Sequence, residues 1–147
     1  MTKQDFIKEL GDAKAAHVKW HAYAQALAMG VESGAEKLPQ LYTDCSFGKW
    51  YYSTGHFLSF MNAFNEIEPL HIQLHKLYME IYQKYLEPEK GGLFKSAEKA
   101  KKQKTKELNN LVAQLKEVSA MLINKFTEVQ TNISNMTEEE LMRELNA

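Results

Sequence analysis

The feature that most constrains the fold is an apolar stripe that recurs at alternating steps of four and three residues. In the first long segment it comprises Phe6, Leu10, Ala13, His17, Trp20, Ala24, Leu27 and Val31. Such steps place all of these side chains on one face of a helix. The spacing therefore predicts a bundled helix, with Thr2 or Asp5 as its N-cap and its end between Gly30 and Gly34.

Two more segments carry stripes of the same kind. The middle one comprises Phe60, Phe64, Ile67, His71, Leu74, Tyr78, Ile81 and Tyr85, and the last one Leu108, Leu111, Leu115, Val118, Leu122, Phe126, Val129 and Ile133. Pro69 predicts a break near residues 66–68. We expect Pro88 and the pair Gly91-Gly92 to end the middle helix and the last helix to run from about Phe94 to Ile133.

Shorter helical pieces are expected between and after these segments. Gly34 and Pro39 break the first connection, and a short helix can follow from Cys45 to about Ser53, with Asp44 or Thr43 as its cap. Gly55 ends that helix, and a second short piece carries Phe57, Phe60, Met61 and Phe64. Thr137 and Glu140 have the spacing of a capping box, which predicts a terminal helix.

Signals for β-strands are nearly absent, because no stretch alternates with a period of two for long. The sequence therefore predicts an all-α fold: a four-helix bundle with a short extra helix that carries Cys45. At 147 residues, one domain spanning 1–147 is expected.

Composition excludes several classes of function. The formal net charge is −1, so no global charge recruits nucleic acid or an anionic membrane, and the lysine-rich stretch 95–106 is interpreted as a solvated helix face. No apolar stretch approaches 18 residues, and the N-terminus lacks the apolar part of a signal peptide. The single cysteine fits a reducing compartment. We expect a cytoplasmic protein that binds neither nucleic acid nor membrane.

The candidate metal ligands are His17, Cys45, His71 and His75. His17 and His71 lie on apolar stripes, where a histidine is costly to bury unless its ring nitrogens are satisfied. His75 projects from the same helix face as His71, four residues on. A thiolate and three imidazoles suit tetrahedral zinc better than magnesium, calcium or manganese.

Other interpretations of these residues remain open. A histidine on an apolar stripe is more often a satisfied core residue than a ligand, and Trp20 and Trp50 are explained by core packing alone. His17 and His21 form a second pair at ligand spacing, which is typical of di-iron bundles, but those sites also need inward-facing carboxylates. Glu66, Glu68 and Glu80 lie outside or beside the stripe. We therefore expect His21 at the rim of the bundle and His56 in solvent.

Three motifs resemble the chemoreceptor zinc-binding domains of bacteria. They are His17-x-x-Trp20, Cys45-x-Phe47-Gly48-x-Trp50 and His71-x-x-x-His75, and the resemblance spans about residues 10 to 130. It implies that His17, Cys45, His71 and His75 bind zinc, that the protein forms a homodimer, and that it serves chemotaxis or cyclic-di-GMP signalling. The chain carries no receptor coiled coil and no cyclase domain, so we expect a free-standing member.

The expected function is regulatory. A site closed by four protein ligands has no open position for substrate, and no phosphate-binding loop or nucleophile elbow occurs, so we expect no enzyme. Three ligands come from long helices, whereas Cys45 comes from a short one that can detach at modest cost. The hypothesis is a sensor of zinc or of oxidants, with Cys45 as the labile ligand, and the resemblance implies hypochlorous acid as one such oxidant. The alternative is a permanent zinc staple in an interaction module.

Overall fold

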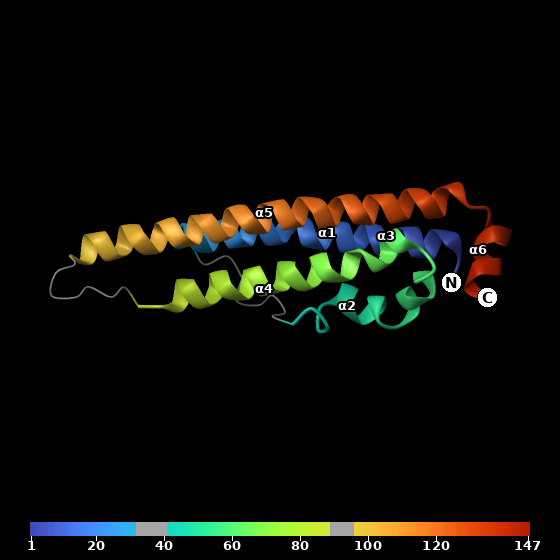
Figure 1. Cartoon of the computed structure of the whole chain (residues 1–147), viewed down its shortest axis with the longest axis horizontal. Helices are drawn as coiled ribbons and strands as arrows, with labels where there is room; N and C mark the ends of the chain where they lie inside the picture. The colour runs from blue at the N-terminus through green and yellow to red at the C-terminus, as the bar shows by residue number, and fades with distance from the viewer. Residues whose placement is uncertain (32–40, 89–95) are drawn as a thin grey trace.

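The computed structural model describes residues 1–31, 41–88 and 96–147, and these residues form helices and turns (Figure 1). The elements are α1 (Lys3–Ala28), α2 (Ser46–Tyr51), the 3-10 helix η2 (Thr54–Leu58), α3 (Asn62–Asn65), α4 (Ile67–Leu86), α5 (Ala97–Asn135) and α6 (Glu138–Leu145). The predicted all-α class and the short helix next to Cys45 are confirmed.

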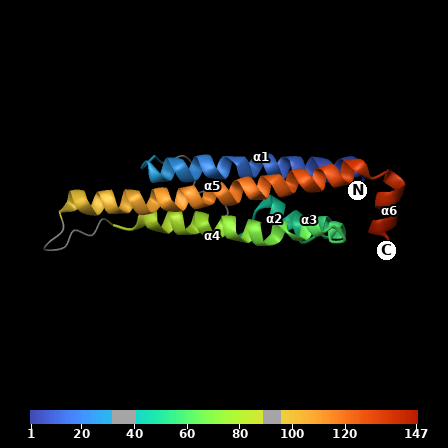
Figure 2. The ribbon, with the colours of Figure 1, turned by 45° about the horizontal axis from the view of Figure 1, so that its top comes forward.

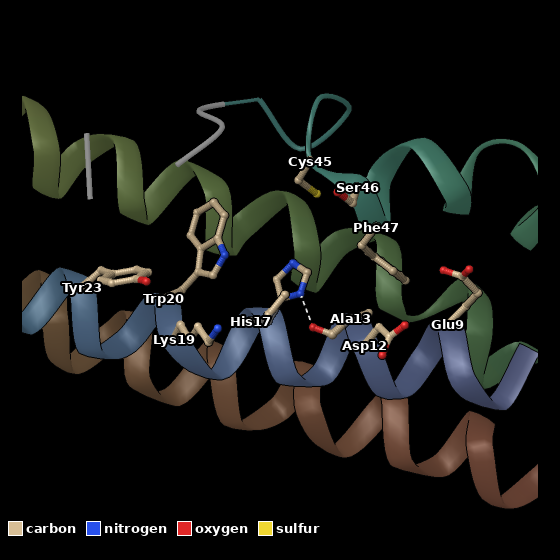
Figure 3. A pocket seen from close by; sticks show the side chains of 11 residues that line it. Glu9, Asp12, Ala13, His17, Lys19, Trp20, Tyr23, Cys45, Ser46 and Phe47 are labelled. Atoms are coloured by element: carbon tan, nitrogen blue, oxygen red, sulfur yellow. Dashed lines mark hydrogen bonds between the residues drawn. The ribbon is translucent and has the colours of Figure 1, made fainter. Parts of the chain in front are cut away.

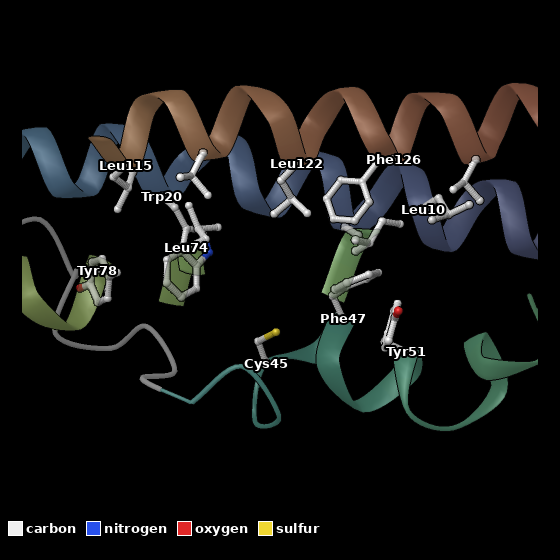
Figure 4. Close-up of a cluster of buried hydrophobic side chains, with 14 of the residues drawn as sticks. Leu10, Trp20, Cys45, Phe47, Tyr51, Leu74, Tyr78, Leu115, Leu122 and Phe126 are labelled. Atoms are coloured by element: carbon white, nitrogen blue, oxygen red, sulfur yellow. The ribbon is translucent and has the colours of Figure 1, made fainter. Parts of the chain in front are cut away.

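The long helices α1, α4 and α5 pack together along their lengths. α5 runs antiparallel to both α1 and α4 and lies between them in the turned view (Figure 2). The apolar stripes face the shared core, where Leu10, Leu74, Leu115, Leu122 and Phe126 are completely buried. Figure 4 shows that Phe47 and Tyr51 of α2 point toward the same core. The short segment thereby joins the bundle core.

The ends of the long helices follow the predicted capping signals with small shifts. Thr2 and Asp5 form a capping box at the start of α1, and α1 ends at Ala28, just before Gly30 with its φ of 76°. Val31 was predicted to extend the stripe, but it lies beyond the helix and is exposed. Thr137 and Glu140 form the predicted capping box of α6.

The start of α5 lies later than the sequence predicted. Ser96 is its N-cap, because the Ser96 hydroxyl accepts a hydrogen bond from the backbone N–H of Lys99. The predicted start at Phe94 lies outside the described residues, as do the predicted breakers Gly34, Pro39, Gly91 and Gly92.

The connection from α2 to α4 differs in detail from the prediction. Neither Asp44 nor Thr43 caps α2; the N-cap is Cys45, and the helix ends at Tyr51. Phe57 was predicted on a short helical piece and Phe60 also on the middle apolar stripe, but both are exposed, Phe57 in η2 and Phe60 in the turn before α3. The break predicted by Pro69 is confirmed, since α3 ends at Asn65 and α4 begins at Ile67.

The two ends of the described chain are held at one end of the bundle (Figure 1). The Lys3 ammonium donates to the carbonyls of Ser134 and Met136 at 2.9 and 2.7 Å, which satisfies carbonyl groups near the end of α5. Among the described helices, none combines the length and apolar character needed to cross a bilayer.

Candidate metal centre

The four predicted ligands meet in one place inside the bundle. His17 comes from α1, Cys45 from the N-cap of α2, and His71 and His75 from α4. One ligand atom of each lies within 4.8 Å of those of the other three. The histidines are 2% exposed and Cys45 is 7% exposed. We call these four residues the His–Cys cluster.

The distances within the His–Cys cluster are close to those of a tetrahedral site. The Cys45 Sγ lies 3.3 Å from the Nε2 of His71, which lies 3.1 Å from the Nε2 of His75. Tetrahedral zinc with ordinary bond lengths separates neighbouring ligand atoms by roughly 3.3–3.6 Å. The two α4 histidines are four residues apart, so one helix face supplies both. Small side-chain adjustments would therefore suffice to hold one ion.

The hydrogen bonding of His17 indicates whether a metal ion fits the His–Cys cluster. Its Nδ1 lies 2.6 Å from the carbonyl oxygen of Ala13, one turn earlier in α1, so Nδ1 carries the proton and donates. The Nε2 is then an acceptor, and it is buried without a hydrogen-bond partner among the described residues. An unsatisfied buried acceptor costs free energy, and a metal ion would remove that cost. The donor set of one sulfur and three imidazole nitrogens therefore fits zinc.

Cys45 is held by the first turn of α2. The backbone N–H of Gly48 donates to its Sγ at 3.2 Å, as in other side-chain N-caps. A Cβ at Gly48 would overlap the carbonyl oxygen of Tyr42 and lie 2.9 Å from its carbonyl carbon. Because both are backbone atoms, no side-chain rotation can relieve the overlap. Gly48 thus permits the close packing of the turn that carries Cys45.

Burial sets the protonation of the His–Cys cluster in the absence of metal. Loss of solvent lowers the pKa of His17 and lowers the pKa of His71 to about 2, with His17 and His75 adding to the shift of His71. Burial also raises the pKa of the Cys45 thiol, which the backbone N–H groups of the α2 turn partly offset. Both histidines are therefore neutral and able to coordinate, whereas the thiol must lose a proton to do so.

Aromatic rings enclose the His–Cys cluster. Trp20 stacks on His17 with ring centroids 5.9 Å apart and lies 4.4 Å from His75. Phe47 contacts His17, His71 and Phe126 at 5.7, 5.0 and 4.9 Å, so it links α2 to all three long helices. These contacts agree with the interpretation of Trp20 as a packing residue, and they cover part of the surface of the three histidine rings.

Several contributors to the centre were not predicted. The Ala13 carbonyl fixes the His17 tautomer, and its position four residues before His17 is the signal that identifies it. The Tyr42 carbonyl lies 3.5 Å from the Cys45 Sγ, and the Tyr42 ring contacts His71 at 6.3 Å. No spacing in the sequence links Tyr42 to the site, since the turn that brings it there has no motif.

The remaining histidines do not join the centre. His21 is partly buried and His56 is exposed, and neither belongs to the cluster of metal-binding side chains in the described residues. That cluster also contains no carboxylate. A di-iron site requires bridging carboxylates, so the geometry does not support the di-iron interpretation.

A cleft of about 420 Å³ leads from the surface to the His–Cys cluster (Figure 3). α1 forms one wall, and the start of α2 forms the other. The lining residues are Glu9, Asp12, Ala13, Ala16, His17, Lys19, Trp20, Tyr23, Cys45, Ser46 and Phe47. His17 and Cys45 face one another across this space.

Comparison with known families gives one match: residues 17–82 match the chemoreceptor zinc-binding domain. The matched segment begins at His17 and contains the whole His–Cys cluster, so the predicted resemblance is confirmed there, and zinc is supported as the cofactor. The match is shorter than the predicted span of residues 10 to 130, because α5 lies outside it. No curated protein and no solved structure matched the chain.

Proposed function

We propose that this chain, which contains a chemoreceptor zinc-binding domain match over residues 17–82, is a zinc-dependent signalling module without catalytic activity. In this proposal His17, Cys45, His71 and His75 hold one zinc ion. The observation that carries the proposal is the burial of these four donors within 4.8 Å of one another. When bound, zinc would supply the positive charge that keeps the Cys45 thiol deprotonated.

Cys45 is the ligand that we propose to be labile. The three histidines lie on helices of 26 and 20 residues, whereas Cys45 caps a helix of only six residues. A short helix bordered by turns opens at lower free-energy cost than a long helix in the core. Falling zinc would free Cys45 first. An oxidant such as hypochlorous acid would take two electrons from the sulfur, leaving sulfenic acid and chloride.

Metal analysis and oxidant titration of one cysteine variant test this proposal. The purified protein should hold one zinc per chain, and hypochlorous acid should release that zinc with formation of sulfenic acid at Cys45. Cys45→Ala should bind zinc more weakly and should form no sulfenic acid. His56→Ala, which changes an exposed histidine, should behave as wild type. A Cys45→Ala protein with unchanged zinc affinity and oxidant response would refute the mechanism.

A structural role for zinc is the second candidate. One ion at the His–Cys cluster would tie together α1, α2 and α4, which favours a staple. Chelators of graded affinity separate the two roles when helicity is followed by circular dichroism. A staple predicts that the bundle melts as the metal leaves. A sensor predicts a folded zinc-free form in which only the region of α2 changes.

The output of the module is also a proposal. We infer a homodimer in chemotaxis or cyclic-di-GMP signalling, acting through a protein partner in the cytoplasm. The 39-residue α5 and the exposed apolar side chains of Val18 and Met121 are compatible with a helical interface. Sedimentation analysis of the zinc-loaded and zinc-free protein tests the dimer. A monomer in both states at high concentration would contradict it.

A further inference from the structure

We propose that the cleft between α1 and the start of α2 is the route by which zinc and small thiol reagents reach the His–Cys cluster. The zinc part of this inference rests on the proposed function. The thiol part does not, because Cys45 is the only cysteine and can be probed in the zinc-free protein.

The burial of the lining residues distinguishes an outer end of the cleft from an inner end. Asp12, Ala16, Lys19 and Ser46 are exposed and form its outer part, whereas His17 and Cys45 are buried and form its inner part. The lining thus runs from solvent to two of the four ligands. His71 and His75 do not line the cleft, although their ligand atoms lie within 4.8 Å of those of that pair. We therefore expect a zinc ion or a reagent that enters the cleft to contact Cys45 and His17 before it contacts the histidines of α4.

The inner end of the cleft presents atoms that a cation or an electrophile can use. The His17 Nε2 is buried and lacks a hydrogen-bond partner among the described residues. The Cys45 Sγ faces it across the cleft (Figure 3). Two other cavities of comparable size, one lined by Glu80, Gln83 and Lys84 and the other by Lys101, Lys102 and Thr105, touch none of the four ligands.

The charges at the outer end favour a cation. Glu9 and Asp12 lie three residues apart on α1, so both carboxylates border the same side of the cleft. Lys8 pairs with Asp12 at 2.6 Å and offsets part of its charge, and Lys19, further along α1, also lines the cleft. Glu9 has no such ion pair in the described structure, so we expect its carboxylate to contribute more of the attraction than that of Asp12. Carboxylates at a cleft mouth raise the local concentration of a cation and its association rate.

Mutations that obstruct an entry route and mutations that remove a metal ligand have different effects on the binding kinetics. Narrowing a route slows association and dissociation by the same factor, so the equilibrium affinity stays unchanged. Loss of a ligand instead weakens the affinity. Ala16 is suited to this test, because it is exposed, lines the outer cleft and is not a predicted ligand.

The first experiment compares Ala16→Trp with Ala15→Trp. Ala15 is the adjacent exposed alanine of α1 and does not line the cleft, so it controls for a bulky residue on this helix. Stopped-flow mixing with zinc gives the association rate, and a chelator chase gives the dissociation rate. We expect Ala16→Trp to slow both rates by at least about tenfold, because binding then requires an opening motion. Its zinc affinity should stay within about twofold of wild type.

The second experiment follows alkylation of Cys45 by iodoacetamide in the zinc-free variants. The thiolate sulfur bonds to the reagent carbon as iodide leaves, and the thiol proton goes to solvent. Ala16→Trp should react more slowly than Ala15→Trp by a factor similar to that found for zinc association. Equal alkylation rates in the two folded variants would overturn the route, even if the wild type bound no zinc. Absence of zinc binding with slowed alkylation would refute only the proposed function.

A charge variant tests the mouth of the cleft. Glu9→Gln should lower the zinc association rate several-fold at low salt, with little effect at high salt, because screening removes the attraction. The matched control is Glu117→Gln, which removes an exposed carboxylate of α5 outside the cleft. Circular dichroism verifies that all variants are folded. If Ala16→Trp does not fold, Ala16→Leu narrows the cleft with a smaller side chain. Equal zinc association rates for Glu9→Gln and Glu117→Gln would show that the Glu9 carboxylate does not attract zinc to the cleft.

Discussion

α4 and α2 contribute to the same His–Cys cluster, but they hold their ligands in different ways. His71 and His75 lie in a 20-residue helix whose position is fixed by Ile67, Leu74 and Ile81, all completely buried. Cys45 lies immediately before a six-residue helix and caps that helix with the same sulfur that would bind metal. α4 therefore presents its ligands with or without metal, whereas the placement of Cys45 depends on local contacts.

The largest expected effect comes from α4. Replacing both His71 and His75 by alanine removes half of the ligands and should abolish zinc binding. Structural zinc sites provide about 10–16 kcal/mol in total, so the loss should exceed about 5 kcal/mol, or more than about a thousandfold in affinity. Competition with a fluorescent chelator measures the change. The double variant His21→Ala/His56→Ala, outside the cluster, should retain wild-type affinity. An α4 double variant with wild-type zinc affinity would show that His71 and His75 do not bind the metal.

The next effect concerns the turn that carries Cys45. Gly48→Ala places a methyl group against the Tyr42 backbone and should displace this turn, without affecting the packing of the long helices. Because Gly48 acts through Cys45 and does not itself bind metal, we expect a loss of about 10–100-fold in zinc affinity. Cobalt substitution gives a specific measurement, since the thiolate-to-metal absorption band should weaken.

Gly11→Ala is the matched control for this substitution. Gly11 lies within α1, and a Cβ there would lie 3.3 Å from the Nε2 of the flexible Gln130 side chain, which can move away. Its zinc affinity and cobalt spectrum should match those of wild type. Equal affinities for the two alanine variants would show that the turn tolerates displacement and that Cys45 is less constrained than its contacts suggest.

The pH dependence of the zinc-free protein separates the two regions. The folded-state pKa of His71 is lowered to about 2, so the unfolded chain binds more protons below about 6.5, and stability falls with decreasing pH. His71 alone should cost about 1.4 kcal/mol per pH unit below its unfolded pKa, and His17 acts in the same direction. The pKa of Cys45 is raised, so its contribution is present at neutral pH and is lost as the pH rises above about 9.

Urea unfolding at several pH values in the presence of chelator measures this profile. His71→Ala should flatten the acidic side, and Cys45→Ser should flatten the alkaline side. If His71→Ala left the acidic side unchanged, the buried histidine of α4 would not be the group that limits stability there.

The contrast between the long helices and the short segment around Cys45 also explains what could be predicted from the sequence. The stripes on the long helices repeat over many turns, so they predicted α1, α4 and α5 and placed His17 and His71 in the core. The i, i+4 spacing then added His75. Details of the short segment were not predictable, because capping by Cys45 and the approach of Tyr42 depend on backbone contacts in a turn. Asp44 was a better cap by residue preference alone, but the packing of Phe47 into the core selects the register in which Cys45 takes that position.

The smallest expected effect separates the two roles of the Cys45 sulfur. Cys45→Ser and Cys45→Ala both remove the thiolate ligand, but serine retains a side-chain acceptor for the Gly48 N–H, whereas alanine does not. In the zinc-free protein, loss of an N-cap costs about 1 kcal/mol, so the Gly48 amide should exchange with solvent roughly fivefold faster in Cys45→Ala. Hydrogen exchange followed by NMR measures this rate, and the Leu74 amide of α4 should exchange equally in both variants. Equal Gly48 rates would mean that a side-chain acceptor at position 45 does not stabilise α2, and that the release of Cys45 from metal would leave this helix in place.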